Sequence, residues 1–457
     1  MGRRQAHAVV IGASIAGLCA ARVLSHFYEQ VTLFERDTLP DVPANRSAVP
    51  QGRHLHLLMA RGASEFGALF PGLLDDMVAG GIAILQDEPR AIHFGAAGHV
   101  LGIPTELRET FTTYLPSRPF LEWQIRRHAT SLPNVAIRQR SVIAPRYEAD
   151  VQRVTGVVLD DGEFVAADLV VDASGRGSRL PVWLSEWGYD RPPEKTVNVG
   201  IGYASQWLRL ADGLLEEKVI VAGASREQPL GLGLQYCEDG TWVLTTFGVA
   251  KVEPPGDFPE MCAVAEKILP AHHAAAIRRA EPIGEVAFHK YPQSRWRRYD
   301  KLIRFPAGIV AFGDAVASFN PTYGQGMTMT SLQAGHLRRA LENSREELAA
   351  TLNRATAKTT LPVWTMNAVG DIVLHRASGH TPPWYPLVGE LFDQLLGAAE
   401  TEPELAEWFL RRFSLLDSLY MIPSARIVGR TVRHNMRCWW AERRRTRVVS
   451  ARSGSGV

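Results

Sequence analysis

The sequence predicts an α/β protein in which a Rossmann-like domain is assembled from three separate segments. An inserted β-rich domain and a helical C-terminal region complete the predicted fold. The first supporting observation is a strand, glycine turn, helix and second strand at the N-terminus. The second is a pair of strand-to-loop junctions much later in the chain, and the third is a set of strand-like runs between them. Strands that alternate with glycine loops and helices are typical of parallel α/β sheets.

The N-terminal segment, VVIGASIAGLCAARVLSHFYEQVTLFERD, carries most of a dinucleotide fingerprint. Gly12, Ser14 and Gly17 occupy the three small-residue positions of G-x-G-x-x-G. The first permits a tight turn, and the last lets the helix pack closely on the strand. Serine in the middle is still small enough for a pyrophosphate to approach the helix start. Glu35 ends the second strand, 18 residues beyond Gly17, where an acid is expected to bind an adenosine ribose hydroxyl.

Length and composition indicate an ordinary globular protein of two or three domains, with 457 residues and a formal net charge of +2. Acids and bases nearly balance, so we expect neither nucleic acid nor a strongly anionic membrane as a partner. The four cysteines lie far apart and form no C-x-x-C pair, which argues against disulfides, a zinc site or a redox dithiol. We therefore predict no metal and a cytoplasmic location. No apolar run reaches the roughly 20 residues of a transmembrane segment.

Two later segments repeat the strand-to-loop pattern. GEFVAADLVVDASGRGSRLP places Asp172 at the mouth of a loop, and AGIVAFGDAVASFNPTYGQGMTMTSLQAGHLRRAL places Gly313 and Asp314 at another. In the second of these segments a Pro-Gly loop opens a long helix near Gly326. Three such junctions, spread over about 300 residues, can converge on one ligand.

The region between these junctions contains several strand-like runs, which predict a mixed sheet with a function separate from that of the N-terminal sheet. In TWVLTTFGVA, a period of two puts Trp242 and Leu244 on one face and Phe247 on the other. One face should cover the core of the sheet, and the other can line a pocket. After about Asn343 the sequence is helical in pattern and rich in tryptophan.

The order and spacing of these motifs resemble FAD-dependent monooxygenases of the para-hydroxybenzoate hydroxylase type, over about residues 9–341. Four segments are similar, more narrowly, to the branch of bacterial polyether flavoprotein epoxidases and squalene epoxidase-like enzymes: RSAVPQGRHLHLLMARG, SRPFLEWQIRRHA, DASGRGSR and FNPTYGQGMTMTSLQA. The resemblance implies an FAD-binding domain of the glutathione reductase and para-hydroxybenzoate hydroxylase type. Ala317 stands where the hydroxylases often have a histidine, so that histidine's role does not transfer.

The resemblance also implies where FAD and substrate lie. The ADP half is expected at the first glycine turn and Glu35, the phosphates near Arg118, the ribityl chain at Asp314, and the flavin ring against Gly324 to Met327. The complete expected cofactor set is Gly12, Ser14, Ile15, Ala16, Gly17, Glu35, Arg36, Arg53, His54, Arg118, Val142, Asp172, Gly313, Asp314, Gly324, Gln325, Gly326 and Met327. The expected substrate pocket is Trp242, Leu244, Phe247, Phe288, Phe319 and Tyr323. His54 and His56 are candidates for an acid or base, and no other catalytic side chain is expected because the flavin carries the chemistry.

Two functions remain open at the level of sequence. The first is a monooxygenase, in which reduced FAD and dioxygen give a C4a hydroperoxide that epoxidises or hydroxylates an apolar polyketide- or terpenoid-like substrate in natural-product biosynthesis. NAD(P)H would supply electrons directly or through a separate flavin reductase. The second is a non-redox cyclase, in which FAD shapes a pocket for a decalin-forming [4+2] cycloaddition. Substrate identity, electron donor and oligomeric state are left open.

The predicted boundaries follow the motifs. Residues 1–75, 105–182 and 285–342 should form the FAD-binding domain, 76–104 and 183–284 the substrate domain, 343–445 a helical region, and 446–457 a disordered tail.

Overall fold

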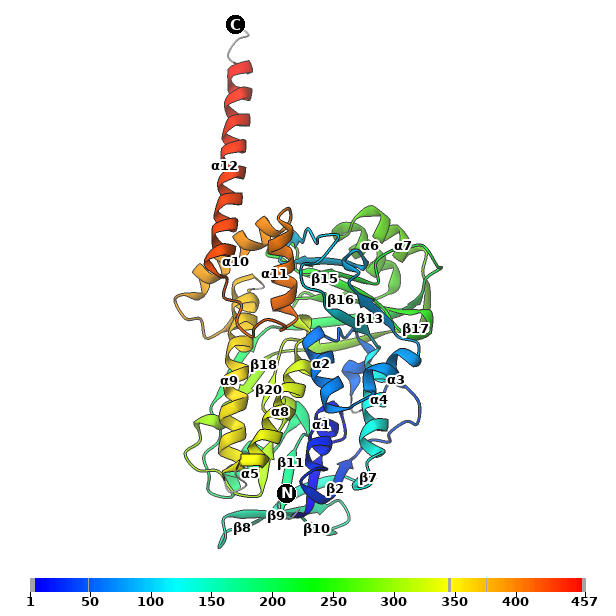
Figure 1. Ribbon diagram of the computed structural model, residues 1–457, viewed down its shortest axis with the longest axis vertical. Helices are drawn as coiled ribbons and strands as arrows, with labels where there is room; N and C mark the ends of the chain where they lie inside the picture. Colours follow the sequence, from blue (N-terminus) through cyan, green and yellow to red (C-terminus); the bar gives the residue numbers. More distant parts are fainter. Residues whose placement is uncertain (1–4, 48, 344–346, 375, 454–457) are drawn as a thin grey trace.

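The computed structural model describes residues 5–47, 49–343, 347–374 and 376–453. A parallel sheet with helices packed against it forms one end of the body, and a larger mixed sheet forms the other (Figure 1). Helices from the last quarter of the chain run along the side of the body, and the final helix projects away from it. This arrangement agrees with the α/β fold class that the sequence predicts.

The parallel sheet has five strands in the order β19-β11-β1-β2-β7. Their bounds are β1 Gln5–Ile11, β2 Tyr28–Glu35, β7 Val135–Gln139, β11 Leu169–Asp172 and β19 Ile309–Ala311. All pairs are parallel, with Ile11 opposite Asp172 and Asp172 opposite Ala311. The three predicted junctions therefore leave neighbouring strands at the same carboxyl edge, where ligands bind in open parallel sheets.

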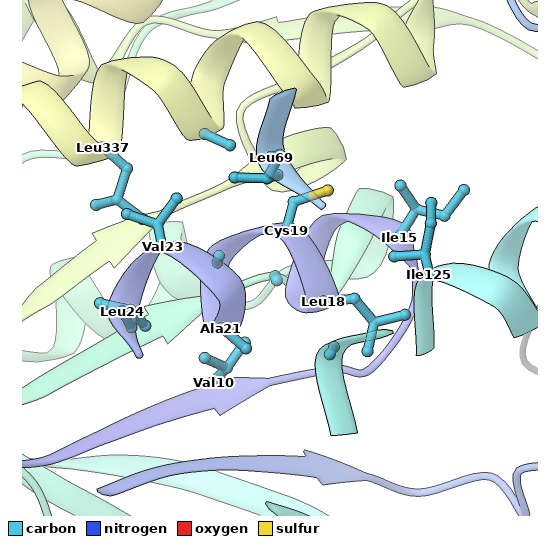
Figure 2. Close-up of a cluster of buried hydrophobic side chains, with 14 of the residues drawn as sticks. Val10, Ile15, Leu18, Cys19, Ala21, Val23, Leu24, Leu69, Ile125 and Leu337 are labelled. Atoms are coloured by element: carbon cyan, nitrogen blue, oxygen red, sulfur yellow. The ribbon is translucent and has the colours of Figure 1, made fainter. Parts of the chain in front are cut away.

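Helix α1 (Ile15–Leu24) packs between this sheet and the long helix α8 (Gly326–Asn343). Figure 2 shows Val10 of β1 below α1 and Leu337 of α8 above it, with Leu18 and Cys19 of α1 between them. The helix has small or aliphatic residues on nearly every side, and these are buried. A helix that is apolar all round lies in the interior of a domain. The N-terminal fingerprint is thus held by the first hydrophobic core.

The mixed sheet has seven strands in the order β17-β13-β16-β15-β14-β4-β5. Their bounds are β4 Ile92–Ala96, β5 His99–Val100, β13 Ile201–Arg209, β14 Val219–Ala222, β15 Leu230–Tyr236, β16 Thr241–Gly248 and β17 Glu281–Tyr291. Helices α6 (Phe258–Ile268) and α7 (Ala271–Arg278) cover one face, where a core cluster joins both helices to the sheet. The inserted β-rich domain that the sequence predicts is therefore present, and its other face turns toward the loops of the parallel sheet.

Smaller elements complete the body. Two short sheets pair β8 (Val142–Glu148), β9 (Arg153–Leu159) and β10 (Phe164–Ala166), and pair β3 (Ala83–Gln86) with β6 (Thr112–Leu115). A four-stranded sheet joins β12 (Glu194–Asn198), β18 (Ser294–Arg297), β20 (Ala317–Ser318) and β21 (Ser378–Gly379). The remaining helices before residue 344 are α2 (Ala60–Leu69), α3 (Leu73–Ala79), α4 (Arg118–Thr130) and α5 (Leu180–Glu186).

The C-terminal part is helical, as the sequence predicts. It contains α9 (Leu348–Val369), α10 (Tyr385–Ala399), α11 (Pro403–Phe413) and α12 (Ala425–Ser453). Helix α12 continues into the segment 446–457 that was expected to be disordered, and the last four residues of that segment lie outside the described residues. Within the described ranges, no helix has the length and apolar character that crossing a membrane requires.

Candidate functional site: three loops at one sheet edge

The turn between β1 and α1 brings backbone amides and the acid of β2 together. Gly12 has a positive φ of 99°, and a Cβ there would lie 2.8 Å from the carbonyl oxygen of Ala173. At Gly17 a Cβ would lie 1.9 Å from the carbonyl oxygen of Gly12, so only glycine lets α1 approach β1 this closely. The Ala13 amide donates to Glu35 Oε2 at 3.0 Å. Glu35 therefore lies at the mouth of the glycine turn.

A group of polar side chains lies beside this turn, and we call it the Glu122 cluster. Its members are Ser14, Glu35, Arg46, Arg118 and Glu122. Arg46 Nε and Arg118 Nη2 donate to different oxygens of Glu122, at 2.8 Å and 2.9 Å. Ser14 Oγ donates to the Glu122 oxygen that Arg118 binds, at 2.9 Å. Arg46 Nη1 lies 3.3 Å from Glu35 Oε2, so the cluster extends to the acid of β2.

The Glu122 cluster is buried and charged. Burial opposes ionisation of Glu122, but the Arg118 and Arg46 guanidiniums outweigh it and hold the pKa of that carboxyl below its usual range. Arg118 Nη1 and Arg46 Nη2 are buried and have no hydrogen-bond partner among the described residues. A guanidinium carries donors only, so these atoms lack an acceptor. Carboxylate and phosphate oxygens are acceptors that the planar guanidinium of arginine binds well.

The second junction, after β11, stabilises its own loop. Asp172 is fully buried, and its carboxylate accepts hydrogen bonds from Ser174 Oγ and Ser178 Oγ, each at 2.5 Å. The Ser174 amide also donates to it at 3.1 Å. Asp172 therefore fixes the loop that faces Gly12, and the hydrogen bonds of its carboxylate within the described residues go to its own chain segment.

The third junction, after β19, carries an acid whose ionisation is disfavoured. The Gly313 amide donates to Gln333 Oε1 of α8 at 2.7 Å, which holds the Gly-Asp turn against that helix. Burial raises the pKa of Asp314, and Arg176 and Arg118 oppose the rise. An acid placed beside two arginines at the mouth of a parallel sheet is suited to accept hydrogen bonds from sugar or ribityl hydroxyls.

The loop before α8 ends in an accessible helix start. Gly324 has a positive φ of 67°, and a Cβ there would lie 2.6 Å from Met59 Cε. A Cβ at Gly326 would meet nothing within 4 Å, so the first turn of α8 borders open space. Gln325 is buried, and Met327 packs against the first core. Free amides and the positive end of the helix dipole at this position favour negative charge on a ligand.

His54 links the mixed sheet to the loops of the parallel sheet. It follows the short helix η1 (Pro50–Arg53), and its Nδ1 lies 2.7 Å from Ser205 Oγ of β13. Burial, with smaller contributions from His56 and His289, lowers the pKa of His54 to about 3. His54 is therefore neutral at physiological pH. Its Nε2 is buried and unpartnered within the described part of the chain.

Aromatic rings surround His54 on the sheet. The centroid of the His54 ring lies 5.8 Å from that of Tyr203 and 5.7 Å from that of His289, and Phe247 lies 6.2 Å beyond Tyr203. The Tyr203 hydroxyl is buried and has no hydrogen-bond partner among the described residues. We call these four residues the His54 face: His54, Tyr203, Phe247 and His289. It combines an apolar wall with two polar atoms that lack partners, which is typical of small-molecule sites.

The other aromatic and aliphatic residues expected in the pocket lie elsewhere. Trp242 and Leu244 pack in the core under α6 and α7, on the face of β16 opposite Phe247. Phe288 pairs with Ala204, and Ala204 pairs with Thr246, so Phe288 also lies on the face opposite Phe247. Its side chain is 58% exposed. The alternation predicted for β16 is present, and the structure places Phe247, but not Trp242, Leu244 or Phe288, next to His54.

The remaining expected residues have simple placements. Phe319 is buried beside Trp364, and the Tyr323 hydroxyl donates to Asp371 Oδ1 at 3.1 Å. Ile15 is buried in the first core. Ala16 lies against the third junction, because a Cβ added to Gly313 would be 2.6 Å from the Cβ of Ala16. Arg36 and Arg53 are exposed. Val142 begins β8 and packs at the margin of the second core. His56 Nδ1 donates to the backbone carbonyl of His54 at 2.8 Å.

Sequence reasoning missed two members of the Glu122 cluster. Arg46 lies in the motif RSAVPQGRHLH and Glu122 in SRPFLEWQ, but the sequence predicts no role for either residue. An arginine and a glutamate in two motifs can neutralise each other when buried, but these two residues are 76 positions apart in the sequence. Only the fold shows that the two motifs meet at Glu122, beside Ser14.

The comparisons with known proteins place the chain in a family. A family model described as the Mycobacterium Rv3254 C-terminal domain matches residues 379–445. Protein Rv3254 of Mycobacterium tuberculosis is 64% identical over 469 residues, covering 99% of this chain and 99% of that protein. The chain belongs to the Rv3254 family. Kynurenine 3-monooxygenase of Salinispora arenicola is a more distant relative, 27% identical over 72% of this chain and 70% of that protein.

Solved structures share the fold of this member of the Rv3254 family. The p-nitrophenol 4-monooxygenase PnpA of Pseudomonas putida DLL-E4 aligns with a TM-score of 0.62 at 16% identity, over 91% of this chain and 99% of that one. The Diels-Alderase PyrE3 of pyrroindomycin biosynthesis aligns with a TM-score of 0.60 at 18% identity, over 90% of this chain and 80% of that one. These likenesses confirm a flavin monooxygenase-like fold. The narrower likeness to polyether epoxidases stays a prediction.

Proposed function

We propose that this protein binds FAD and is a monooxygenase that oxygenates a mostly apolar small molecule. The observation that carries the proposal is the pair of buried guanidinium nitrogens, on Arg118 and Arg46, that lack acceptors beside the Gly12 turn. They lie at the carboxyl edge of a parallel sheet, where a pyrophosphate belongs in this kind of fold. The relatives named as kynurenine 3-monooxygenases support the oxygenase reading.

The chain offers a partner for each part of FAD. Glu35 would accept hydrogen bonds from the adenosine ribose, and Arg118 and Arg46 would donate to the phosphates. Asp314 would accept from the ribityl chain, and the start of α8 at Gly326 would face the flavin ring. The unpartnered donors and the open space at Gly326 are the features that fit the cofactor.

Bound FAD would supply the redox chemistry with dioxygen, and the protein would supply position and a dry environment. Helix α8 would stabilise negative charge at the near edge of the ring through its first amides. His54 is neutral, so it can donate or accept one hydrogen bond at Nε2 without adding charge to the pocket. No side chain is required as a nucleophile.

The substrate would lie against the His54 face. Phe247 and Tyr203 provide apolar area, and the Tyr203 hydroxyl and His54 Nε2 would orient one polar group of the substrate. A polyketide- or terpenoid-like alkene fits this composition better than a sugar or a nucleotide. Because the chain has one glycine fingerprint only, NAD(P)H would bind transiently, or a separate flavin reductase would deliver the electrons.

A stepwise experiment tests the proposal. Untagged protein is stripped of flavin and titrated with FAD, and retention after gel filtration is measured for the wild type, Glu35→Ala and, as a control, Glu29→Ala, an exposed residue of the same strand. We expect one FAD per chain in the wild type and the control, and at least tenfold weaker binding in Glu35→Ala. Equal retention in all three proteins would remove Glu35 from the site.

The reaction is then tested with squalene as an apolar alkene and L-kynurenine as an aromatic amino acid. Each probe is incubated with the FAD-loaded protein, dioxygen and NADPH, with and without an added flavin reductase, and products are identified by mass. One added oxygen atom in the squalene product supports an oxygenase of apolar alkenes. Oxygenation of kynurenine alone would contradict the apolar substrate class.

A non-redox cyclase is the competing function, because a Diels-Alderase shares the fold. The discriminating condition is anaerobic incubation of a linear polyene carrying a diene and a dienophile with FAD-loaded protein and no reductant. Cyclised product of unchanged mass would replace the oxygenase proposal. Its absence, together with oxygen-dependent product, would support that proposal.

A further inference from the structure

On the far side of the mixed sheet, three nitrogen- and oxygen-bearing side chains converge outside the site described above. We propose that Glu217, His272 and His273 form a binding site for a divalent transition metal ion of the Zn²⁺ class. We call these residues the Glu217 cluster. One ligand atom from each residue lies within 4.8 Å of the others. Two imidazoles and one carboxylate are a ligand set that Zn²⁺ accepts in proteins.

The distances suit a single ion. His273 Nε2 lies 2.9 Å from Glu217 Oε1, and His272 Nε2 lies 3.9 Å from the same oxygen. Ligand atoms held tetrahedrally at about 2.1 Å from one ion are about 3.4 Å apart. The two observed separations bracket that value, so small side-chain adjustments suffice to bind an ion between the three groups.

The second observation is that His273 is buried and has Glu217 as a close but poorly aligned neighbour. Its side chain is 1% exposed, and neither ring nitrogen makes a well-directed hydrogen bond within the described chain, despite the short approach to Glu217. A buried polar atom without a partner destabilises the fold. A metal ion would satisfy the ring nitrogen, and Glu217 would neutralise part of the ion's charge.

The fold holds the three ligands in place from separate segments. Glu217 comes just before β14, and both histidines lie in the first turn of α7. His93 of β4 pairs with Ile220 of β14 and packs edge-on against His273, with ring centroids 4.8 Å apart. His93 therefore limits rotation of the His273 ring. His272 is 66% exposed, which leaves a route for the ion and a position for a bound water.

A metal ion bound at the Glu217 cluster would stabilise the fold and would not take part in the oxygenation reaction. Ile220 belongs to the core under α6 and α7, so the Glu217 cluster lies on the face of the sheet opposite Phe247. A bound ion would connect the start of α7 to two strands of the sheet. Sequence spacing could not reveal this site, because residues 93, 217 and 272–273 are far apart along the chain.

The experiment uses untagged full-length protein treated with EDTA and freed of the chelator. Zn²⁺ is titrated calorimetrically, and Co²⁺ is used as a visible probe because its absorption reports four-coordinate geometry. The main variant is His272→Ala, which removes an exposed ligand and opens no core cavity. Glu217→Gln is the second variant, since it keeps shape and removes charge. The control is His434→Ala. On α12, His434 Nε2 lies 3.3 Å from Cys438 Sγ, and this pair could bind a metal ion independently of the Glu217 cluster.

We expect the wild type and His434→Ala to bind one Zn²⁺ per chain, and both cluster variants to bind at least tenfold more weakly. Saturating Zn²⁺ should raise the thermal midpoint of the wild type by roughly 2–5 °C. It should leave His272→Ala unchanged. The proposal is overturned if the wild type shows no saturable binding, or if His434→Ala loses the ion while His272→Ala retains it.

Discussion

The Glu122 cluster and the Glu217 cluster each surround one carboxylate with nitrogen-bearing side chains, but the nitrogens differ in what they lack. In the first, the unpartnered atoms belong to Arg46 and Arg118, which can only donate. In the second, they belong to His273, and a neutral imidazole has one nitrogen that only accepts. Donors without acceptors favour an anion, whereas ring nitrogens that can present a lone pair beside a carboxylate favour a metal ion.

The difference shows that a list of charged residues does not identify a ligand. Both sites join segments far apart in sequence, and both contain glutamate. Arginine stays protonated at every physiological pH, so the Glu122 cluster keeps its positive groups. A histidine binds a metal ion through a deprotonated ring nitrogen, so a Glu217 cluster that holds an ion contributes only the negative charge of its carboxylate. The protonation of the nitrogen partner decides the sign of the ligand.

The largest expected effect comes from removing a donor from the Glu122 cluster. Arg118→Met should leave the Glu122 carboxylate buried with one cation fewer, and unfolding free energy should fall by about 3–5 kcal/mol. FAD retention should be lost with it. Urea unfolding and flavin absorbance measure the two effects. Arg127→Met, an exposed change on the same helix, should alter neither; comparable losses in both variants would point to helix α4 in general.

A smaller effect is expected from removing the carboxylate while keeping the donors. Glu122→Gln retains one acceptor for Arg118 or Arg46 but not both, so the unfolding free energy should fall by about 1–3 kcal/mol. FAD affinity should change by less than tenfold, because the guanidiniums that would bind phosphate remain. If this variant loses FAD as completely as Arg118→Met, the donors do not decide the anion site, and the comparison fails.

The smallest effect is a pH dependence from the neutral histidine of the His54 face. Burial lowers the pKa of His54 to about 3 in the folded state, whereas an unfolded histidine has a pKa of about 6.5. As pH falls below about 6.5, the unfolded chain therefore binds a proton that the folded chain does not. Stability should drop by about 1 kcal/mol from this group between pH 6 and pH 5.

Urea unfolding at pH 7, 6 and 5 measures this dependence, with His54→Gln as the comparison. The variant has no titrating ring, so its stability should decline less steeply with acid. An equal slope in both proteins would show that His54 is protonated in the folded state. The Glu122 cluster should add no slope in this range, because Glu122 stays ionised and its arginines stay protonated.

The parallel-sheet half of the molecule was predictable because its constraints are local. The Gly12 turn, the position of Glu35 and the Gly313–Asp314 pair each follow a strand at fixed spacing, and the edge of a parallel sheet brings them together. Period-two alternation likewise separated Phe247 from Trp242 and Leu244. It could not tell which face was covered by helices, because α6 and α7 come later in the chain.

What the sequence did not predict depends on long-range contacts. Arg46 and Glu122 are ordinary surface residue types until the loop before η1 packs against α4. Phe288 lies in a strand whose pattern is weak, and its register against Ala204 decides its face. The Glu217 cluster forms only when the segment before β14 packs against the start of α7. In each case the missing information was which segments become neighbours.

Helix α12 changes how the whole molecule moves through solvent. Its 29 residues span about 43 Å at 1.5 Å per residue, and its outer part stands clear of the body in Figure 1. A compact chain of 457 residues has a radius of gyration of only about 22 Å. The projecting rod adds little mass but much friction. The protein should therefore sediment more slowly and tumble less isotropically than a sphere of its mass, and its scattering profile should contain a tail of long interatomic distances.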